Sequence, residues 1–168
     1  WASFAFSAGG SFDGAAASPD GTQPTVSNSF GTAVAFGAPT TIDFTDGAAS
    51  VSRSKNGVLK LYGAGEANVM VSEEAISAST GLAITVKPKA ASALSLAVEA
   101  ESVAAGEGDR LTITAIDVYG NTATSYSGSK SLTFSGAEPS PSGKAPSVTN
   151  RNGVAVAFGS TTSLSFSA

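Results

Sequence analysis

The feature that most constrains this chain is an internal repeat. The twenty residues from Val26 to Thr45 return as Val148 to Ser167, at an offset of 122 positions, and ten of the twenty are identical. A shorter similarity joins SFAFSA, from Ser3, to SLTFSG, from Ser131, at an offset of 128, which implies a loop six residues longer in the first copy. The distance of 122 positions between the two copies matches the length of one domain, about 100–150 residues. The sequence therefore predicts domain-sized modules and not a solenoid of short units.

Short alternations of apolar and polar residues predict strands throughout the chain. Residues 93–98, for example, place Leu94, Leu96 and Val98 on one face. Asp46-Gly47 predicts a tight turn, and Lys55-Asn56-Gly57 predicts a hairpin between residues 49–53 and 58–62. No apolar pattern with a period of 3.6 persists for ten residues. We therefore expect an all-β fold of about eleven to fourteen short strands.

The expected core consists of the apolar residues at the inward phase of these strands. These are Phe4, Phe6, Val34, Phe36, Ile42, Phe44, Leu59, Leu61, Val69, Val71, Ile84, Leu94, Leu96, Leu111, Ile113, Leu132, Phe134, Val156, Phe158, Leu164 and Phe166.

Composition excludes several classes of function. The 168 residues include no Cys and no His, so disulfides, thiolate zinc sites and imidazole bases are excluded. The net charge is −4 and no basic cluster occurs, which argues against nucleic acid as a partner. The sequence contains no run of about 18 apolar residues, the length that would predict a membrane-spanning helix. We find no active-site motif and expect no enzymatic activity.

Asp117, Asn121 and Asp109 are the candidate metal ligands, because loop oxygens of this kind can bind Ca²⁺. The favoured alternative is a structural turn formed by Asp117, Tyr119, Gly120 and Asn121. In such a turn the Asp and Asn side chains accept local N–H groups, and the Gly adopts a positive φ. No cofactor is expected on this alternative.

For the other residues that could take part in catalysis or ligand binding, structural roles are favoured. Glu73 and Glu74 are adjacent on a strand, so they point to opposite faces and cannot act together on one substrate. Lys60 is out of phase with its apolar neighbours, which argues against a buried lysine that forms an isopeptide bond. Aromatic residues could stack on sugars, but core or turn packing is favoured for them: Trp1, Tyr62, Tyr119 and Tyr126. The many Ser and Thr residues leave O-linked glycans open.

Three stretches of the chain resemble tandem bacterial immunoglobulin-like repeats of the invasin (Big) type: residues 57–88, 92–100 and 105–128. Asp117, Tyr119, Gly120 and Asn121 match the D-x-Y-G-N turn of that family, while Gly63, Gly65, Val69 and Val71 match its late hairpin. The resemblance implies an Ig-like antiparallel β-sandwich in a long, repetitive, extracellular or cell-surface bacterial protein. Fold alone does not fix function.

The resemblance also implies how the chain divides. Residues 87–92 read as a boundary, so residues 1–89 would be the back part of one Ig-like repeat and residues 90–168 the front part of the next. The expected function is a structural spacer or assembly module of a fibrous or adhesin-like protein.

Two alternative functions are left open. One is a filament subunit that assembles with other copies of the chain by head-to-tail β-strand complementation. The other is a carbohydrate-binding or adhesion module. The strands expected to assemble are those that carry Phe4, Phe6, Phe36, Phe44, Phe134, Phe158 and Phe166.

Overall fold

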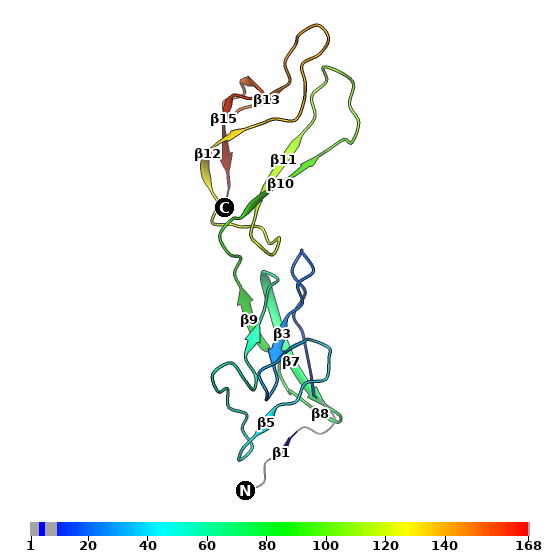
Figure 1. Cartoon of the computed structure of the whole chain (residues 1–168), viewed down its shortest axis with the longest axis vertical. Coiled ribbons are helices and arrows are strands. Elements are labelled where there is room, and N and C mark those ends of the chain that lie inside the picture. Colours follow the sequence, from blue (N-terminus) through cyan, green and yellow to red (C-terminus); the bar gives the residue numbers. More distant parts are fainter. Residues whose placement is uncertain (1–3, 6–9, 168) are drawn as a thin grey trace. The chain divides into compact units, whose positions relative to one another are not determined.

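A computed structural model describes residues 4–5 and 10–167, and every regular element in that part of the chain is a β-strand (Figure 1). Each strand pairing is antiparallel. The prediction of an all-β fold is therefore confirmed, with fifteen strands in place of the expected eleven to fourteen. The described residues include no helix with the length and apolar character of a membrane span. The chain divides into two compact units, Trp1–Thr122 (unit 1) and Ala123–Ala168 (unit 2).

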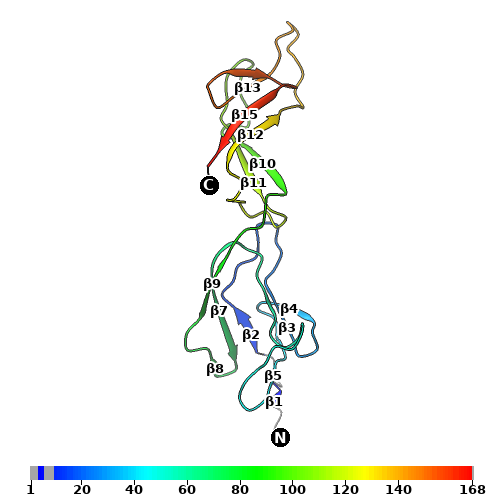
Figure 2. The ribbon, with the colours of Figure 1, turned by 90° about the vertical axis from the view of Figure 1, so that its left-hand side faces the viewer.

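Unit 1 contains a four-stranded sheet built around its longest strand, β7 (Gly65–Glu73). This strand pairs with β2 (Ser11–Asp13), β8 (Ile76–Ser77) and β9 (Leu82–Val86), and Figure 2 labels the four strands. The register places Phe12 opposite Val71 and Ala67 opposite Ile84. The alternation of apolar residues along β7 buries Ala67 and Val69, which is the pattern of a strand with one face toward a core.

A second sheet of unit 1 has β3 (Thr25–Ser27) at its centre, between β4 (Ala33–Ala35) and β6 (Leu59–Lys60). Two separate strand pairs complete the unit. They are β1 (Phe4–Ala5) with β5 (Asp43–Phe44), and β10 (Ala93–Val98) with β11 (Leu111–Ile116).

Unit 2 contains two strand pairs. They are β12 (Gly128–Thr133) with β15 (Thr161–Phe166), and β13 (Ser147–Thr149) with β14 (Ala155–Ala157). The pair β13–β14 has the same register as β3–β4, with every residue number larger by 122. The turn between the strands is also the same in both copies. Asn28 Oδ1 accepts from the N–H groups of Phe30 and Thr32, at 3.0 and 2.9 Å, and Asn150 Oδ1 does so two and four residues onward, at 2.9 and 3.0 Å.

The structure corrects the second offset expected from sequence. Phe12, and not Phe6, is the counterpart of Phe134, because Phe12 lies against Phe36 as Phe134 lies against Phe158, with ring centroids 5.9 Å apart in both pairs. The N–H of Gly37 donates to the Phe12 carbonyl at 2.8 Å, and that of Gly159 donates to the Phe134 carbonyl at 2.9 Å. The offset is thus 122 here too, and the loop is not six residues longer in the first copy. Seven further identities link residues 12–24 to residues 134–146 at this offset.

The buried apolar residues are fewer than the sequence predicted. Ile42 and Val69 are buried as expected. The prediction is wrong for Leu94, Leu96 and Leu111, which have 39%, 60% and 36% of their surface exposed. Those three lie on β10 and β11, a pair that joins no third strand in the described part of unit 1. Phe6 and the side chain of Phe4 lie outside the described residues. The other predicted core residues are half-buried: Val34, Phe36, Phe44, Leu59, Leu61, Val71, Ile84, Ile113, Leu132, Phe134, Val156, Phe158, Leu164 and Phe166.

The tight turn predicted at Asp46-Gly47 is confirmed. Thr45 and Ala48 exchange backbone hydrogen bonds around Asp46 and Gly47, which both have positive φ. The hairpin predicted around Lys55-Asn56-Gly57 is wrong, because residues 58–60 extend along β3 and not along residues 49–53.

Candidate functional site: the Asp117–Asn121 joint

The turn after β11 is built on Asp117 and Asn121, as the sequence predicted. The N–H of Asp117 donates to the Asn121 carbonyl at 2.9 Å, and the N–H of Gly120 donates to the Asp117 carbonyl at 3.1 Å. Gly120 has a φ of +80°, a conformation in which a Cβ is unfavourable. A single bridge between Ile116 and Thr122 continues the pairing on either side of the turn.

The Asp117 carboxylate is buried, with 3% of the residue exposed, and N–H groups surround it. Oδ1 accepts from the backbone N–H groups of Tyr119 and Asn121, at 2.8 and 3.0 Å. Oδ2 accepts from the N–H of Lys89 at 2.9 Å and from the side-chain amide of Asn121 at 3.0 Å. Burial raises the pKa of Asp117, but the hydrogen bonds from Asn121, Lys89 and Tyr119 outweigh it and hold the pKa below its ordinary value.

The Asn121 side chain connects the turn to the segment between β6 and β7. Its Oδ1 accepts from the N–H of Ala64 at 2.8 Å, and its Nδ2 donates to the Tyr62 carbonyl at 2.8 Å. Asn121 is only 5% exposed, so these two bonds replace bonds that water would otherwise make. One side chain thus fixes two backbone groups that lie more than fifty residues away in the chain.

Ring and backbone contacts surround the same turn. The Tyr62 and Tyr119 rings meet edge to face with centroids 4.9 Å apart, and Lys89 Nζ lies 4.9 Å from the centre of the Tyr119 ring. The N–H of Asp20 donates to the Tyr119 carbonyl at 3.1 Å. A Cβ on Gly120 would lie 3.1 Å from Cβ of Pro19, so the space at this position also favours glycine.

The loop that carries Asp20 has its own hydrogen bonds. The Ser18 hydroxyl and the N–H of Thr22 donate to Asp20 Oδ1, at 2.5 and 2.9 Å, and these bonds, the Ser18 bond foremost, lower the pKa of Asp20. We call the turn at residues 117–121, together with Pro19–Asp20, Tyr62–Ala64 and Lys89, the joint. It ties the end of β11 to the residues before β10, to the β6–β7 connection and to the loop after β2.

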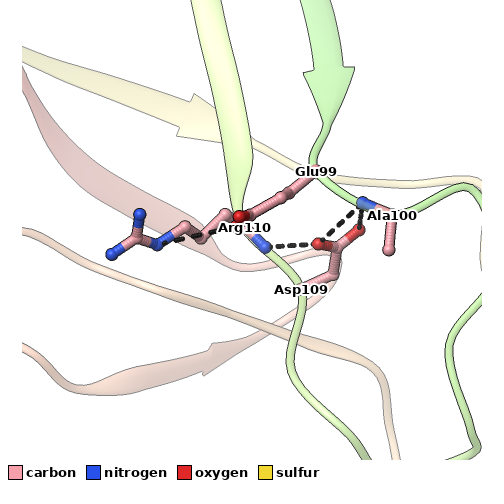
Figure 3. A network of polar contacts seen from close by, with 4 residues as sticks. All are labelled: Glu99, Ala100, Asp109 and Arg110. Carbon is pink, nitrogen blue, oxygen red and sulfur yellow. Dashed lines mark hydrogen bonds and ion pairs between the residues drawn. The ribbon is translucent and has the colours of Figure 1, made fainter.

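The structure does not bring the three candidate calcium ligands together. Asp109 lies at the other end of the β10–β11 pair, where its carboxylate accepts from the N–H groups of Arg110 at 2.7 Å and Ala100 at 3.3 Å (Figure 3). Arg110 also lies 3.8 Å from the Glu99 carboxylate, with both side chains exposed. Asp117 directs both oxygens at N–H donors and Asn121 directs its only oxygen at Ala64, so these side chains bind backbone groups. The residues that the structure describes contain no group of three or more acidic residues suited to a metal ion.

The remaining candidate residues take local roles. Glu73 pairs with Ile76 at the turn between β7 and β8, where Glu74 has a φ of +48°. Lys60 is exposed, in agreement with its phase in the sequence. Tyr126 meets Phe166 edge to face, at 5.1 Å between centroids, and Lys130 Nζ lies 4.6 Å from the Tyr126 ring.

Among the expected assembly residues, Phe6 and the side chain of Phe4 lie outside the described part of the chain, and the others are half-buried. Phe36 and Phe158 lie against Phe12 and Phe134 within their own units, and Phe44 is half-buried.

Sequence reasoning identified the turn of the joint but missed its partners. Tyr62, Ala64 and Lys89 contribute mainly backbone groups, and the identity of a side chain does not reveal where a backbone group bonds. Gly63 was the available signal. A Cβ on Gly63 would lie 3.0 Å from the Ala17 carbonyl oxygen, so the close approach of two loops favours glycine there.

Comparison with known proteins gives no relative: no protein-family model matches the chain, and no curated protein and no solved structure matches it.

Proposed function

We propose that this chain is a structural, non-enzymatic Ig-like repeat module of an extracellular or cell-surface bacterial protein, which acts as a spacer or assembly module. The sheets β2–β7–β8 with β9 and β4–β3–β6 would form the two layers of a β-sandwich. Residues 1–89 would be the back part of one repeat and residues 90–168 the front part of the next. The offset of 122 residues, kept from Phe12 to Phe166, supports a tandem arrangement.

The joint is the observation that carries the spacer role. A spacer has to transmit force from one module to the next without bending at the connection. Residues 87–92 would form that connection, and Lys89 is bonded to Asp117, which lies next to Asn121 and its bonds to the β6–β7 segment. These bonds are part-buried or buried, and they resist separation because opening them leaves polar groups without partners.

Single-molecule stretching of residues 1–168, held by handles at both ends, tests the spacer role. We expect a discrete rupture that releases about 400 Å, the extended length of one repeat period. The antiparallel ladders and the joint must break together to release it. An Asn121→Ala variant should rupture at lower force, and smooth extension without any rupture would contradict the proposal.

A further inference from the structure

The repeated segment occurs in two settings. Among the described residues, the first copy has a further strand along β3 and another along β2, and the second copy has neither at the equivalent positions. In unit 1, β3 pairs with β6 on the side away from β4, where Val26 lies opposite Leu59. The N–H of Ser27 donates to the Val58 carbonyl at 2.9 Å, and the N–H of Gly57 donates to the Ser27 carbonyl at 2.8 Å. The second edge is that of β2, which pairs with β7 and places Phe12 opposite Val71. The segment of residues 56–72 therefore covers both edges.

The same edges are open in unit 2. Within the described residues, β13 pairs only with β14, and β12 pairs only with β15. The burial of the equivalent residues changes accordingly. Val26 is 1% exposed while Val148 is half-buried, and Ser27 is buried while Thr149 is exposed. In unit 1 the Ser27 hydroxyl accepts from the N–H of Val58 at 2.8 Å. Its counterpart Thr149 also has a hydroxyl, which could accept the same bond from a covering strand.

A glycine marks where the covering strand would cross. In unit 1 a Cβ on Gly14 would collide with the carbonyl oxygen of Asn68, and the N–H of Asn68 donates to the Gly14 carbonyl at 2.9 Å. Its counterpart Gly136 has a similar φ, +98° against +86°, but has nothing within 4 Å of a Cβ. Unit 2 thus has the close-approach position of unit 1 without the strand that approaches.

We propose that the open edges of unit 2, residues 133–136 and 147–150, bind the 56–72 segment of a second copy of this chain. By analogy with unit 1, Leu59 would lie opposite Val148 and Val71 opposite Phe134. Strand addition of this kind gains backbone hydrogen bonds and fixes the register through alternate side chains. The inference deepens the assembly role proposed above, and its failure would leave the stretching test of the spacer role unaffected.

A synthetic peptide of residues 56–72 is the probe, since a complete copy can donate this segment only after releasing it from its own unit 1. The peptide is added to the full chain labelled with ¹⁵N, and amide shifts and hydrogen exchange are recorded. We expect changes at residues 133–136 and 147–150, with new protection of the Thr149 amide, and none at residues 11–14 and 25–28. Equal binding of a scrambled peptide, shifts confined to other residues, or no binding at millimolar peptide would overturn the proposal.

A matched pair of glycine variants tests the register. Gly136→Ala places a methyl group where the covering strand would cross, and we expect at least about tenfold weaker binding. Gly143→Ala has the same kind of strain, at a φ of +82°, but both Gly143 and its counterpart Gly21 have nothing within 4 Å. Gly143→Ala should therefore keep the affinity within about twofold. Equal affinities of the two variants would overturn the register, and the exchange data on the unaltered chain locate the site without either variant.

Discussion

Asn121 makes bonds through one side chain to three residues of unit 1: to Tyr62, to Ala64 and to the Asp117 carboxylate. Its replacement by Ala would remove the two part-buried bonds to the Ala64 N–H and the Tyr62 carbonyl, together with the buried bond to Asp117. We expect Asn121→Ala to reduce the free energy of unfolding by about 2–4 kcal/mol, measured by urea denaturation followed by circular dichroism. Asn152→Ala is the control. Asn152 is exposed, so its loss should change stability by less than about 0.5 kcal/mol, and an equal effect of both variants would argue against the joint.

Asp117 gives the joint a dependence on pH. Because hydrogen bonds hold the pKa of this carboxyl below its ordinary value in the folded chain, the unfolded chain binds a proton more tightly at this group. The stability that the carboxylate contributes is therefore complete above about pH 4, the ordinary Asp pKa, and is lost as the pH falls toward the lower pKa of the folded state. Urea denaturation from pH 7 to pH 3 should show this loss. Asp117→Asn should be less stable at pH 7 and show a smaller fall with acid, and parallel curves for the two proteins would contradict the assignment.

At the scale of the element, β10 and β11 show that alternation does not guarantee burial. Leu96 alternates as a half-buried strand residue should, yet it is 60% exposed, whereas Val69 on β7 is 8% exposed. We expect Leu96→Ser to change the free energy of unfolding by less than about 1 kcal/mol and Val69→Ala to reduce it by about 1–3 kcal/mol. Thermal or urea unfolding measures both. A larger loss for Leu96→Ser than for Val69→Ala would mean that another strand covers β10 in solution.

The presence of strands and turns was predictable from the sequence, but the pairing of the strands was not. Asn56-Gly57 has the positive φ values of a tight turn, as its sequence predicted. Its strand partner differs because the Asn56 side chain bonds to the N–H and carbonyl of Asp43, at 2.7 and 2.9 Å, and Gly57 bonds to Ser27. These contacts span 13 and 30 residues of sequence, and no local pattern encodes them.

The joint was predictable to the same extent. The turn of Asp117, Gly120 and Asn121 follows from local hydrogen bonding and a positive φ, and both are confirmed. The contacts to Tyr62 and Lys89 are tertiary and use backbone groups, so residue identity carried no signal for them.

At the scale of the whole molecule, the sequence showed the repeat period of 122 residues but not that the repeat extends back to Phe12. The alternation in residues 3–8 resembles the strand that contains Phe134 and suggested the wrong partner, whereas the ring contacts identify Phe12. Nor did the repeat show that its second copy keeps the fold of β3–β4 while two of its edges have no strand partner among the residues that the structure describes. The similar sequences give the same hairpin in both copies, β3–β4 and β13–β14, whereas β5 is shorter than its counterpart β15. Burial depends on the strands that other parts of the chain supply.

We expect the joint to hold the β10–β11 pair rigidly to the preceding sheets of unit 1. Measurement of ¹⁵N relaxation on the full chain tests this rigidity. We predict one shared correlation time for the amides of β7, β9, β10 and β11, and two different times in the Asn121→Ala variant. A shorter correlation time for β10 and β11 than for β7 and β9 in the unaltered chain would show that the joint does not hold them together.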